Sequence, residues 1–374
     1  MTAETVIAVE DDKVLRFLQV LLDPATPAER MRVFADYVAH DIDQQTWLAD
    51  VHARLPGVFP SSVKLIKTTE ELHAVLPQAE ALVVESMAVG AAELALAPRL
   101  KLIHKFGARA DNIDLAACAA RGVTVKTQRR RTNIAVAEHT MALILALAKQ
   151  LHRLAGKVTV ERLQPLGYAY RKYDTRHTGA NNYGRVGGLR VIHGMTLGLL
   201  GMGEIARELV PMARAFGLKI QYHRRNRLPP AEEAALGVTY CGRDDLFAGS
   251  DILSVHVPLE VATRGLVGAN AINQMKPGAW LINTSRADIV DHDALLAALK
   301  SGRLGAAAAD VHYQEPVDAG EPLLAFDNFL MTPHFAGGPR QTLLDDIEEI
   351  AFNIQQALAL NEKTNAKARE KKAS

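Results

Sequence analysis

Three side chains that could together bind an anion and move a proton each follow an apolar stretch of the chain. Arg286 lies in INTSRADIVD, Glu315 in ADVHYQEP and His334 in MTPHFAGG. In an open parallel sheet, ligands bind beyond the carboxyl ends of the strands, so side chains that follow such strands can converge on one cleft. An oxygen that develops negative charge needs a proton donor and a nearby cation, which this set supplies. Each residue alone would more often be structural.

A glycine turn upstream has the form that binds a dinucleotide. The hexapeptide GMGEIA, residues 201–206, follows the apolar run TLGLL and opens the helical pattern EIARELVPMARAFG. Its first glycine permits a tight turn, its second lets a pyrophosphate approach, and Ala206 lets helix and strand pack closely. The helix N-terminus adds unpaired N–H groups and positive dipole. Such turns also occur for purely structural reasons, but this placement favours nucleotide binding.

A basic cluster follows where an NAD-binding protein usually carries an acid. The next expected strand, KIQYH, ends at His223, about 20 residues past the turn, and Arg224, Arg225 and Arg227 come directly after it. Guanidinium groups form strong charge-assisted hydrogen bonds with phosphate. The cluster therefore favours NADP, with NAD as the less favoured cofactor. The competing interpretation is that these arginines only solvate a loop.

Two series of alternating strand and helix patterns must position these residues. The first runs over residues 63–125 and the second from residue 196 onwards. This alternation predicts an α/β protein of two doubly wound Rossmann-like domains with parallel sheets and an active-site cleft between them. Residues 133–152 predict one long helix, which would bridge the domains or lie in a dimer interface. Residues 153–195 predict a long loop, a candidate cleft flap or partner-subunit contact.

Composition limits the classes of partner. Lys+Arg 43 against Asp+Glu 42 gives a net charge of +1, which offers no general attraction to nucleic acid or an anionic membrane. Cys118 and Cys241 lack the spacing of a disulfide framework or a metal site, which fits a reducing compartment. No apolar run approaches the roughly 18 residues of a membrane span, and the start does not read as a signal peptide. We expect a cytoplasmic protein without metal, nucleic acid or membrane partners.

Seven stretches of the sequence resemble the D-isomer-specific 2-hydroxyacid dehydrogenase family. They cover residues 98–150 and 196–340 and read PRLKLIHKFGARADNIDL, NIAVAEHTMALILALA, TLGLLGMGEIA, DILSVHVPLEVATRGLVG, MKPGAWLINTSRADIVDHDALLAAL, ADVHYQEP and TPHFAGG. The first ninety residues match only in overall pattern. The resemblance, nearest to glyoxylate and hydroxypyruvate reductases, implies a homodimeric oxidoreductase that moves a hydride between NAD(P) and a small anionic 2-hydroxy or 2-oxo acid. It also implies that residues 1–105 plus 337–374 form a flavodoxin-like substrate (catalytic) domain and residues 106–336 the dinucleotide-binding Rossmann domain.

The resemblance also assigns roles to single residues. Arg286 would clamp the substrate carboxylate and polarise the 2-oxo group, His334 would be the acid/base, and Glu315 would orient His334 and favour its charged form. The GARAD turn would receive the carboxylate on the backbone N–H groups of Ala108 and Arg109, beside Arg286 and His334. The expected cofactor contacts are Gly201, Met202, Gly203, Glu204, Ile205, His223, Arg224, Arg225, Val257, Pro258, Thr263, Thr284, Ser285, Arg286, His334 and, near the nicotinamide carboxamide, Asp310.

Some residues depart from the family pattern. Arg109 stands where the family more often has a small apolar residue, and residues 128–131, QRRR, replace a Pro-Gly type of turn. One interpretation is that these arginines read a second anionic group on the substrate, such as a carboxylate. The other is that they pair with acids across a domain or subunit interface.

The leading hypothesis is an NADP-preferring 2-oxoacid reductase, and two alternatives remain. One is a dinucleotide-sensing interaction protein, because the resemblance extends to transcriptional corepressors with the same three residues. The other is a family oxidoreductase acting on a small anion such as phosphite or formate. Glu315 argues against formate, because formate enzymes of the family tend to pair the histidine with Gln.

Overall fold

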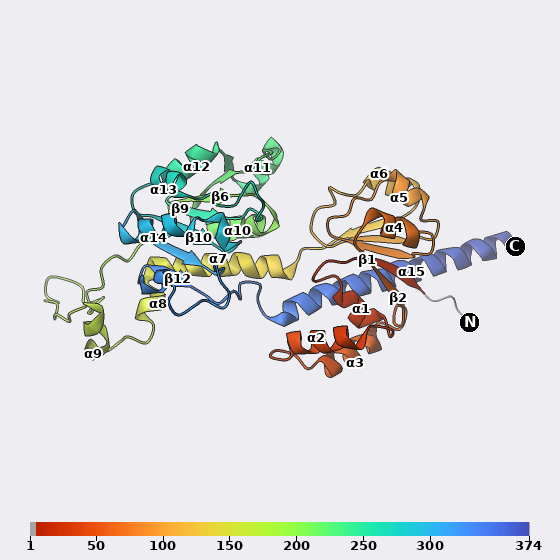
Figure 1. The fold of residues 1–374 in the computed structure, drawn as a ribbon, viewed down its shortest axis with the longest axis horizontal. Helices are drawn as coiled ribbons and strands as arrows, with labels where there is room; N and C mark the ends of the chain where they lie inside the picture. Colours follow the sequence, from red (N-terminus) through yellow and green to blue (C-terminus); the bar gives the residue numbers. More distant parts are fainter. Residues whose placement is uncertain (1–4, 374) are drawn as a thin grey trace. The chain divides into compact units, whose positions relative to one another are not determined.

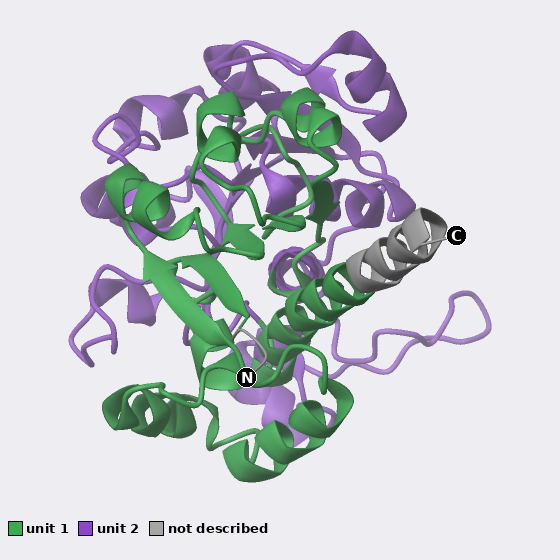
Figure 2. Cartoon of the chain, turned by 90° about the vertical axis from the view of Figure 1, so that its right-hand side faces the viewer, with its two compact units in different colours: residues 1–132, 338–374 green, residues 133–337 purple. Residues whose placement is uncertain are grey.

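The computed structural model describes residues 5–373, and of residues 360–373 it describes the backbone alone. Two compact units make up the chain: unit 1 comprises residues 1–132 and 338–374, and unit 2 comprises residues 133–337 (Figure 2). Each unit contains one parallel sheet, of five strands in unit 1 and seven in unit 2. The predicted α/β class with two Rossmann-like sheets is confirmed.

The sheet of unit 1 has the strand order β2-β1-β3-β4-β5, which is that of flavodoxin-like folds. Its inner strands β3 and β4 are buried on both faces, as in ALVV of β3, because helices cover both sides (Figure 1). The strands are β1 (Val6–Glu10), β2 (Ser62–Ile66), β3 (Ala81–Val84), β4 (Leu102–Lys105) and β5 (Thr124–Thr127). One face packs against α1 (Phe17–Leu22), α2 (Ala28–Val38), α3 (Gln44–Arg54) and α15 (Arg340–Ala373), and the other against α4 (Thr69–Val75), α5 (Ala91–Ala95) and α6 (Leu115–Ala120).

The division between the units differs from the sequence-based expectation at one end. We expected the first domain to end at residue 105, but β5 pairs in parallel with β4 and so extends the sheet of unit 1. The segment from residue 106 to residue 132 therefore belongs to unit 1. The return of the chain to unit 1 at residue 338 lies one residue from the expected position.

The sheet of unit 2 has the strand order β12-β11-β10-β9-β6-β7-β8. Strand order reverses between β6 and β9, and in such sheets a dinucleotide binds at that switch point, beyond the carboxyl ends of the strands. The strands are β6 (Thr196–Leu200), β7 (Lys219–His223), β8 (Thr239–Tyr240), β9 (Ile252–Val255), β10 (Ala279–Asn283), β11 (Leu304–Ala309) and β12 (Phe329–Met331).

Helices also cover both faces of this second sheet. α7 and α10 share a core with one face, and α12, α13 and α14 with the other, as Figure 1 shows for α7 and α14. The helices are α7 (Arg131–Lys149), α8 (Leu151–Leu154), α9 (Val160–Leu163), α10 (Glu204–Ala215), α11 (Pro230–Leu236), α12 (Arg243–Gly249), α13 (Ala269–Gln274) and α14 (His292–Lys300), with 3-10 turns η1 (Gln164–Leu166), η2 (Ala287–Ile289) and η3 (Pro322–Ala325).

The predicted long helix corresponds to α7, which begins in unit 1 and continues into unit 2. Its apolar side chains, including Met141 and Ile144, are buried in the core of unit 2. The predicted loop at 153–195 contains the rest of α8, α9 and η1 and is otherwise irregular up to β6. Its assignment as a flap or partner contact stays a prediction.

Three further findings concern the described residues as a whole. None of their helices is both long enough and apolar enough to cross a membrane. No group of three or more His, Cys, Asp or Glu side chains among them could hold a metal ion. Both cysteines are free thiols, and Cys118 is buried.

Candidate active site

The glycine turn joins β6 to α10 and leaves space beside the helix N-terminus. Gly201 has a φ of +105°, which side chains rarely adopt, and a Cβ there would collide with the backbone carbonyl of His256. Gly203 precedes α10, and no described atom outside its chain neighbours lies within 4 Å of where its Cβ would be. Ala206 is fully buried in the core beneath. These residues fit the pyrophosphate of a dinucleotide, which needs close backbone approach to the N–H groups of α10.

The remaining residues of the turn hold it in place. Met202 is buried and Ile205 packs against the same core as the sheet. The Glu204 carboxylate accepts a hydrogen bond of 2.7 Å from the side-chain amide of Asn133 on α7. The turn is thus fixed to α7 as well as to the strand before it.

The basic cluster after β7 divides into two kinds of arginine. Arg227 donates hydrogen bonds of 2.9 and 2.7 Å to Glu233, which also accepts one of 2.6 Å from the Tyr222 hydroxyl. The Arg227 and Tyr222 bonds lower the pKa of Glu233 to about 2. Arg224 is half-buried and Arg225 exposed, and neither forms a hydrogen bond or ion pair with another described residue. Arg227 therefore stabilises the local structure. Arg224 and Arg225 are the cations of this cluster that can bind a ligand.

His223 itself is held by backbone at the end of β7. Its Nδ1 donates to the carbonyl of Cys241, at 3.0 Å. This bond fixes the ring and leaves Nε2 as the nitrogen that can reach a ligand.

Hydroxyl groups tie together the loops that follow β9 and β10. The Ser285 hydroxyl donates to the Val257 carbonyl at 2.5 Å, and the Thr263 hydroxyl donates to the Pro258 carbonyl at 2.6 Å. Thr284 is buried, and its hydroxyl pairs at 2.9 Å with that of Thr140 on α7. Hydrogen bonds therefore connect the segments that we expect to border the cofactor. The Thr284 side chain, in contrast, points into the protein interior.

The structure brings His334 and Glu315 into direct contact. His334 Nδ1 lies 2.7 Å from a Glu315 oxygen, and the two side chains are 46% and 40% exposed. His334 has a φ of +53°, a conformation that costs energy in residues other than glycine and is concentrated at functional sites. Burial opposes ionisation of Glu315, but hydrogen bonds from His334 and from the His312 N–H outweigh it and lower the pKa of Glu315. The carboxylate is therefore ionised and can stabilise a protonated imidazole.

Arg286 follows β10, the neighbour of β11, while Glu315 and His334 follow β11 and β12. All three thus lie beyond the carboxyl edges of adjacent parallel strands. The Arg286 guanidinium is exposed and contacts the Ser285 carbonyl at 2.6 Å. The Asn283 amide shapes this turn, because it donates to the Arg286 carbonyl and accepts from the Ser285 N–H.

Asp310 is a buried carboxylate that fastens the segment carrying His334. It is 1% exposed and accepts hydrogen bonds from the Thr332 hydroxyl at 2.6 Å and from the N–H groups of Phe335 at 3.1 Å and Ala336 at 2.8 Å. His139 on α7 extends this network to the Thr332 hydroxyl at 3.0 Å. Burial lowers the pKa of His139, although the Asp310 charge opposes this. The expected contact between Asp310 and the nicotinamide carboxamide stays a prediction. The Asp310 carboxylate already accepts three hydrogen bonds from the segment that contains His334.

Ala108 and Arg109, which we expect to contact the substrate, lie in unit 1, after β4. Arg109 forms an ion pair of 2.8 Å with Asp111. Of the QRRR run, Arg130 pairs with Glu85 at 2.6 Å, and Arg131 pairs at 2.8 Å with both Asp346 and Glu349 of α15. Arg109, Arg130 and Arg131 thus each have an acidic partner within unit 1. Both interpretations of these arginines, a second anionic group on the substrate and pairing across an interface, stay predictions.

Four residues that sequence reasoning did not single out shape the site: Asn283, His312, Thr332 and His139. Three of them lie within three positions of a residue that the motifs did identify, so proximity in sequence was a usable signal. His139 had no such signal, because its position in the long helical pattern looked like ordinary core.

Comparison with known proteins places the second unit in a family. Residues 141–336 match the model for the D-isomer specific 2-hydroxyacid dehydrogenase, NAD binding domain. A glyoxylate reductase of Aeropyrum pernix is 38% identical over 251 residues, which are 67% of this chain and 71% of that protein. A D-3-phosphoglycerate dehydrogenase of Archaeoglobus fulgidus is 32% identical over 311 residues, 81% of this chain but 54% of that protein, so the chain spans about half of it.

Solved structures show the same likeness. The apo D-mandelate dehydrogenase of Rhodotorula graminis aligns with a TM-score of 0.54 at 25% identity, covering 94% of this chain and 93% of that one. The fold of both units is therefore matched along nearly the whole chain.

Proposed function

Because the chain belongs to the D-isomer specific 2-hydroxyacid dehydrogenase family, we propose that it is a reductase that converts a small anionic 2-oxo acid to the 2-hydroxy acid with NADPH. The observation that carries the proposal is the contact of 2.7 Å between His334 Nδ1 and a Glu315 carboxylate oxygen. This pair lies beyond the carboxyl edge of the sheet that also carries the glycine turn. Relatives named glyoxylate reductase and D-3-phosphoglycerate dehydrogenase support the substrate class.

The residues of the pair divide the work of proton transfer. Glu315 holds Nδ1 of His334, which leaves Nε2 to face a substrate and donate its proton to the 2-oxo oxygen. The ionised Glu315 stabilises the charged imidazole before that proton leaves. Arg286 binds the carboxylate and stabilises negative charge on the oxygen as it develops. When bound, the nicotinamide supplies the hydride that the 2-oxo carbon receives.

The preference for NADPH rests on Arg224 and Arg225. They follow β7 and have no partner among the described residues, whereas Arg227 is engaged by Glu233. A 2′-phosphate offers them several negatively charged acceptor oxygens, whereas a ribose hydroxyl offers one neutral oxygen. NAD binding by the same turn is retained in this proposal as the weaker interaction.

Two further parts of the proposal concern the assembly and its location. We expect a homodimer, as the resemblance implies, and a cytoplasmic location, as the composition of the sequence favours. Mass measurement by light scattering on the purified chain tests the dimer: a monomeric mass at micromolar concentration would contradict it.

Absorbance of NADPH and of NADH, recorded separately with a panel of 2-oxo acids, tests the reaction. We expect turnover of glyoxylate, hydroxypyruvate or a branched 2-oxo acid, faster with NADPH, and at least a hundredfold loss in His334→Gln, because acid catalysis contributes about that factor. Tight dinucleotide binding without turnover of any 2-oxo acid would contradict the proposal and support the sensor alternative. Reduction of NADP by phosphite, but not by 2-hydroxy acids, would support the inorganic-anion alternative.

A further inference from the structure

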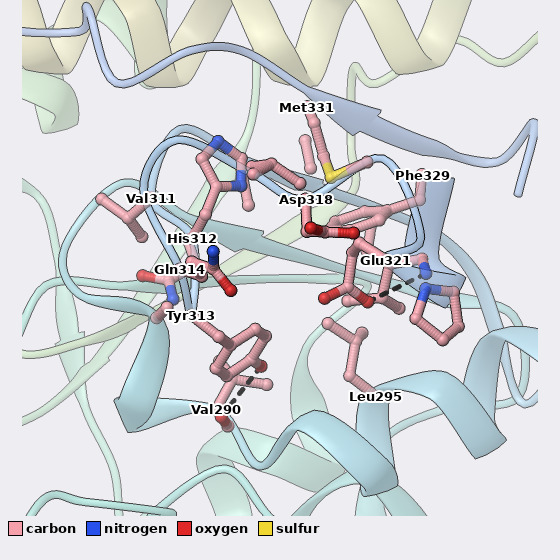
Figure 3. A pocket seen from close by; sticks show the side chains of 18 of the residues that line it. Val290, Leu295, Val311, His312, Tyr313, Gln314, Asp318, Glu321, Phe329 and Met331 are labelled. Atoms are coloured by element: carbon pink, nitrogen blue, oxygen red, sulfur yellow. Dashed lines mark hydrogen bonds between the residues drawn. The ribbon is translucent and has the colours of Figure 1, made fainter. Parts of the chain in front are cut away.

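A cavity of about 290 Å³ lies within unit 2, on the face of the sheet that α14 covers (Figure 3). Its floor is formed by strand residues such as Leu281, Ala307 and Met331, and Leu295 of α14 closes one side. Its roof is the segment from Val311 to Pro322. None of Arg286, Glu315 and His334 lines it, although their neighbours Asn283, His312 and Gln314 do.

The sequence of β11 explains why this space is empty of side chains. The strand reads LGAAAA, and Ala307 and Ala309 belong to the core cluster on the α14 face. Alanine methyl groups leave room that the Val, Ile or Leu usual in buried parallel strands would occupy. The walls are largely apolar, with Val290, Leu295 and Phe329 among the side chains labelled in Figure 3.

The charged side chains on the cavity are both acids. Asp318 and Glu321 line it, and none of the described lining residues is Lys or Arg. One Asp318 oxygen accepts from the Gly320 N–H at 2.7 Å, and one Glu321 oxygen accepts from His292 at 2.9 Å and from the Leu323 N–H at 3.1 Å. The second oxygen of each carboxylate accepts no hydrogen bond from another described residue. A ligand that carries a cation would therefore find two acceptors beside an apolar space.

The carboxylate of Glu321 is ionised in this setting. Burial opposes its ionisation, but the hydrogen bonds from His292 and Leu323 outweigh burial and lower its pKa. The Tyr313 hydroxyl does not compete for it, because it donates to the Val290 carbonyl at 3.0 Å. Negative charge at the cavity is thus present at neutral pH.

We propose that this cavity is a second ligand site, which binds a small apolar molecule that carries one ammonium group. Its volume is about twice that of an apolar cavity that holds benzene, which is about 150 Å³. An aromatic ring with a short alkyl chain, about ten non-hydrogen atoms, fills that space. The ring lies against the partly exposed apolar lining, which includes Tyr313, Val317 and Met331, and the ammonium group meets Asp318 and Glu321. This site does not depend on the proposed reaction.

Calorimetric titration of the full chain with three matched probes tests the chemistry of the site. The probes are 2-phenylethylamine, the neutral 2-phenylethanol and the anionic 3-phenylpropionate. We expect the amine to bind once per chain with a Kd on the order of 1 mM, the alcohol at least fivefold more weakly, and the acid not measurably. Equal binding of amine and alcohol, or no binding of the amine, would overturn the proposal.

Substitutions locate the binding. Asp318→Asn should weaken amine binding about fivefold, towards the affinity of the alcohol, because one charged acceptor is lost. Its matched control, Asp244→Asn, changes an exposed aspartate on α12 and should leave the affinity unchanged. Ala307→Leu should abolish binding of amine and alcohol alike by filling the cavity. If that variant does not fold, the exposed Asp318 still decides the matter: an unchanged amine affinity in Asp318→Asn would refute the site.

A last titration separates this site from the cofactor site. The amine should bind equally well in the presence of saturating NADPH, because the glycine turn and the basic cluster do not line the cavity. Competition between the two would place the amine in the cofactor site and overturn the inference. These outcomes are independent of turnover, so a failure of the proposed reductase activity would not be mistaken for a failure of this site.

Discussion

Replacing Arg224 and Arg225 by glutamine should change the cofactor preference of the protein. Both side chains follow β7 without a partner among the described residues, so their removal breaks no internal bond. A hydrogen bond to a charged group contributes about 1.5–3 kcal/mol, and the lower value suits these solvent-accessible side chains. Two such bonds give about 3 kcal/mol, or roughly a hundredfold in the Kd of NADPH. The Kd of NADH should change no more than about threefold, because NADH lacks the 2′-phosphate.

Fluorescence titration of the double variant with each dinucleotide measures both constants. Arg227→Gln is the matched control from the same cluster, since the structure commits Arg227 to Glu233 and Tyr222. It should leave the ratio of the two dissociation constants unchanged. Equal weakening of NADPH and NADH binding in the double variant would refute the predicted contact with the 2′-phosphate. It would support the alternative that the arginines only solvate a loop. A larger effect on NADPH in the Arg227 variant would show that the structure assigns the wrong arginine.

Three further predictions follow from buried or paired groups. Glu315→Gln should lower the turnover number for 2-oxo acid reduction roughly 10- to 100-fold, by loss of a hydrogen bond to a charged group; an unchanged turnover number would contradict the pairing. Asp310→Asn should lower the turnover number by a similar factor, because its NH₂ group would face the N–H donors of the His334 segment, while the Kd of NADPH changes little; a selective loss of dinucleotide affinity would instead support contact with the nicotinamide. Burial, reinforced by the charge of Lys126, lowers the pKa of His104 to about 4. The unfolded chain therefore binds the extra proton first as the pH falls below 6.5, and stability should decrease by about 2 kcal/mol between pH 7.5 and 5. His104→Leu should remove that part of the pH dependence, as denaturant unfolding at the two pH values would show; an equally steep loss of stability in the variant would refute it.

The second sheet could be predicted from the sequence because its signals are local. Apolar strands such as TLGLL and AWLIN are short, continuous and separated by helical patterns, which is typical of a parallel sheet covered on both sides. The start of the chain carried weaker signals. A clear alternation of strand and helix patterns begins only at residue 63, yet β1 (Val6–Glu10) lies inside the first sheet between β2 and β3. Three helices separate β1 from β2, so no short repeat revealed that the strand belonged there.

The first domain boundary was misplaced for a related reason. The glycine loop at 107 follows an apolar strand and looks like the end of a domain, because the expected chemistry begins there. The pairing of β5 with β4 instead places this segment in unit 1. That pairing is made by backbone hydrogen bonds, which the side chains of TVKT do not reveal. The sequence did predict a strand at VTVKT, but only one residue of β5 is even partly buried, so its pattern did not show which sheet it joins.

The roles of the site residues illustrate the difference between finding a functional residue and knowing what holds it. Motif spacing identified His334 and Glu315, and a direct bond joins them. It could not show that Asp310, 24 positions before His334, fastens that histidine's segment through the backbone N–H groups of Phe335 and Ala336. Every residue type except proline has a backbone N–H group, so the side-chain pattern of a sequence cannot show which of these groups form such bonds. A φ of +53° at His334 requires such external support, because the residue itself disfavours that conformation. The buried Asp310 carboxylate therefore supports the backbone that follows His334, whereas Glu315 contacts the imidazole ring directly.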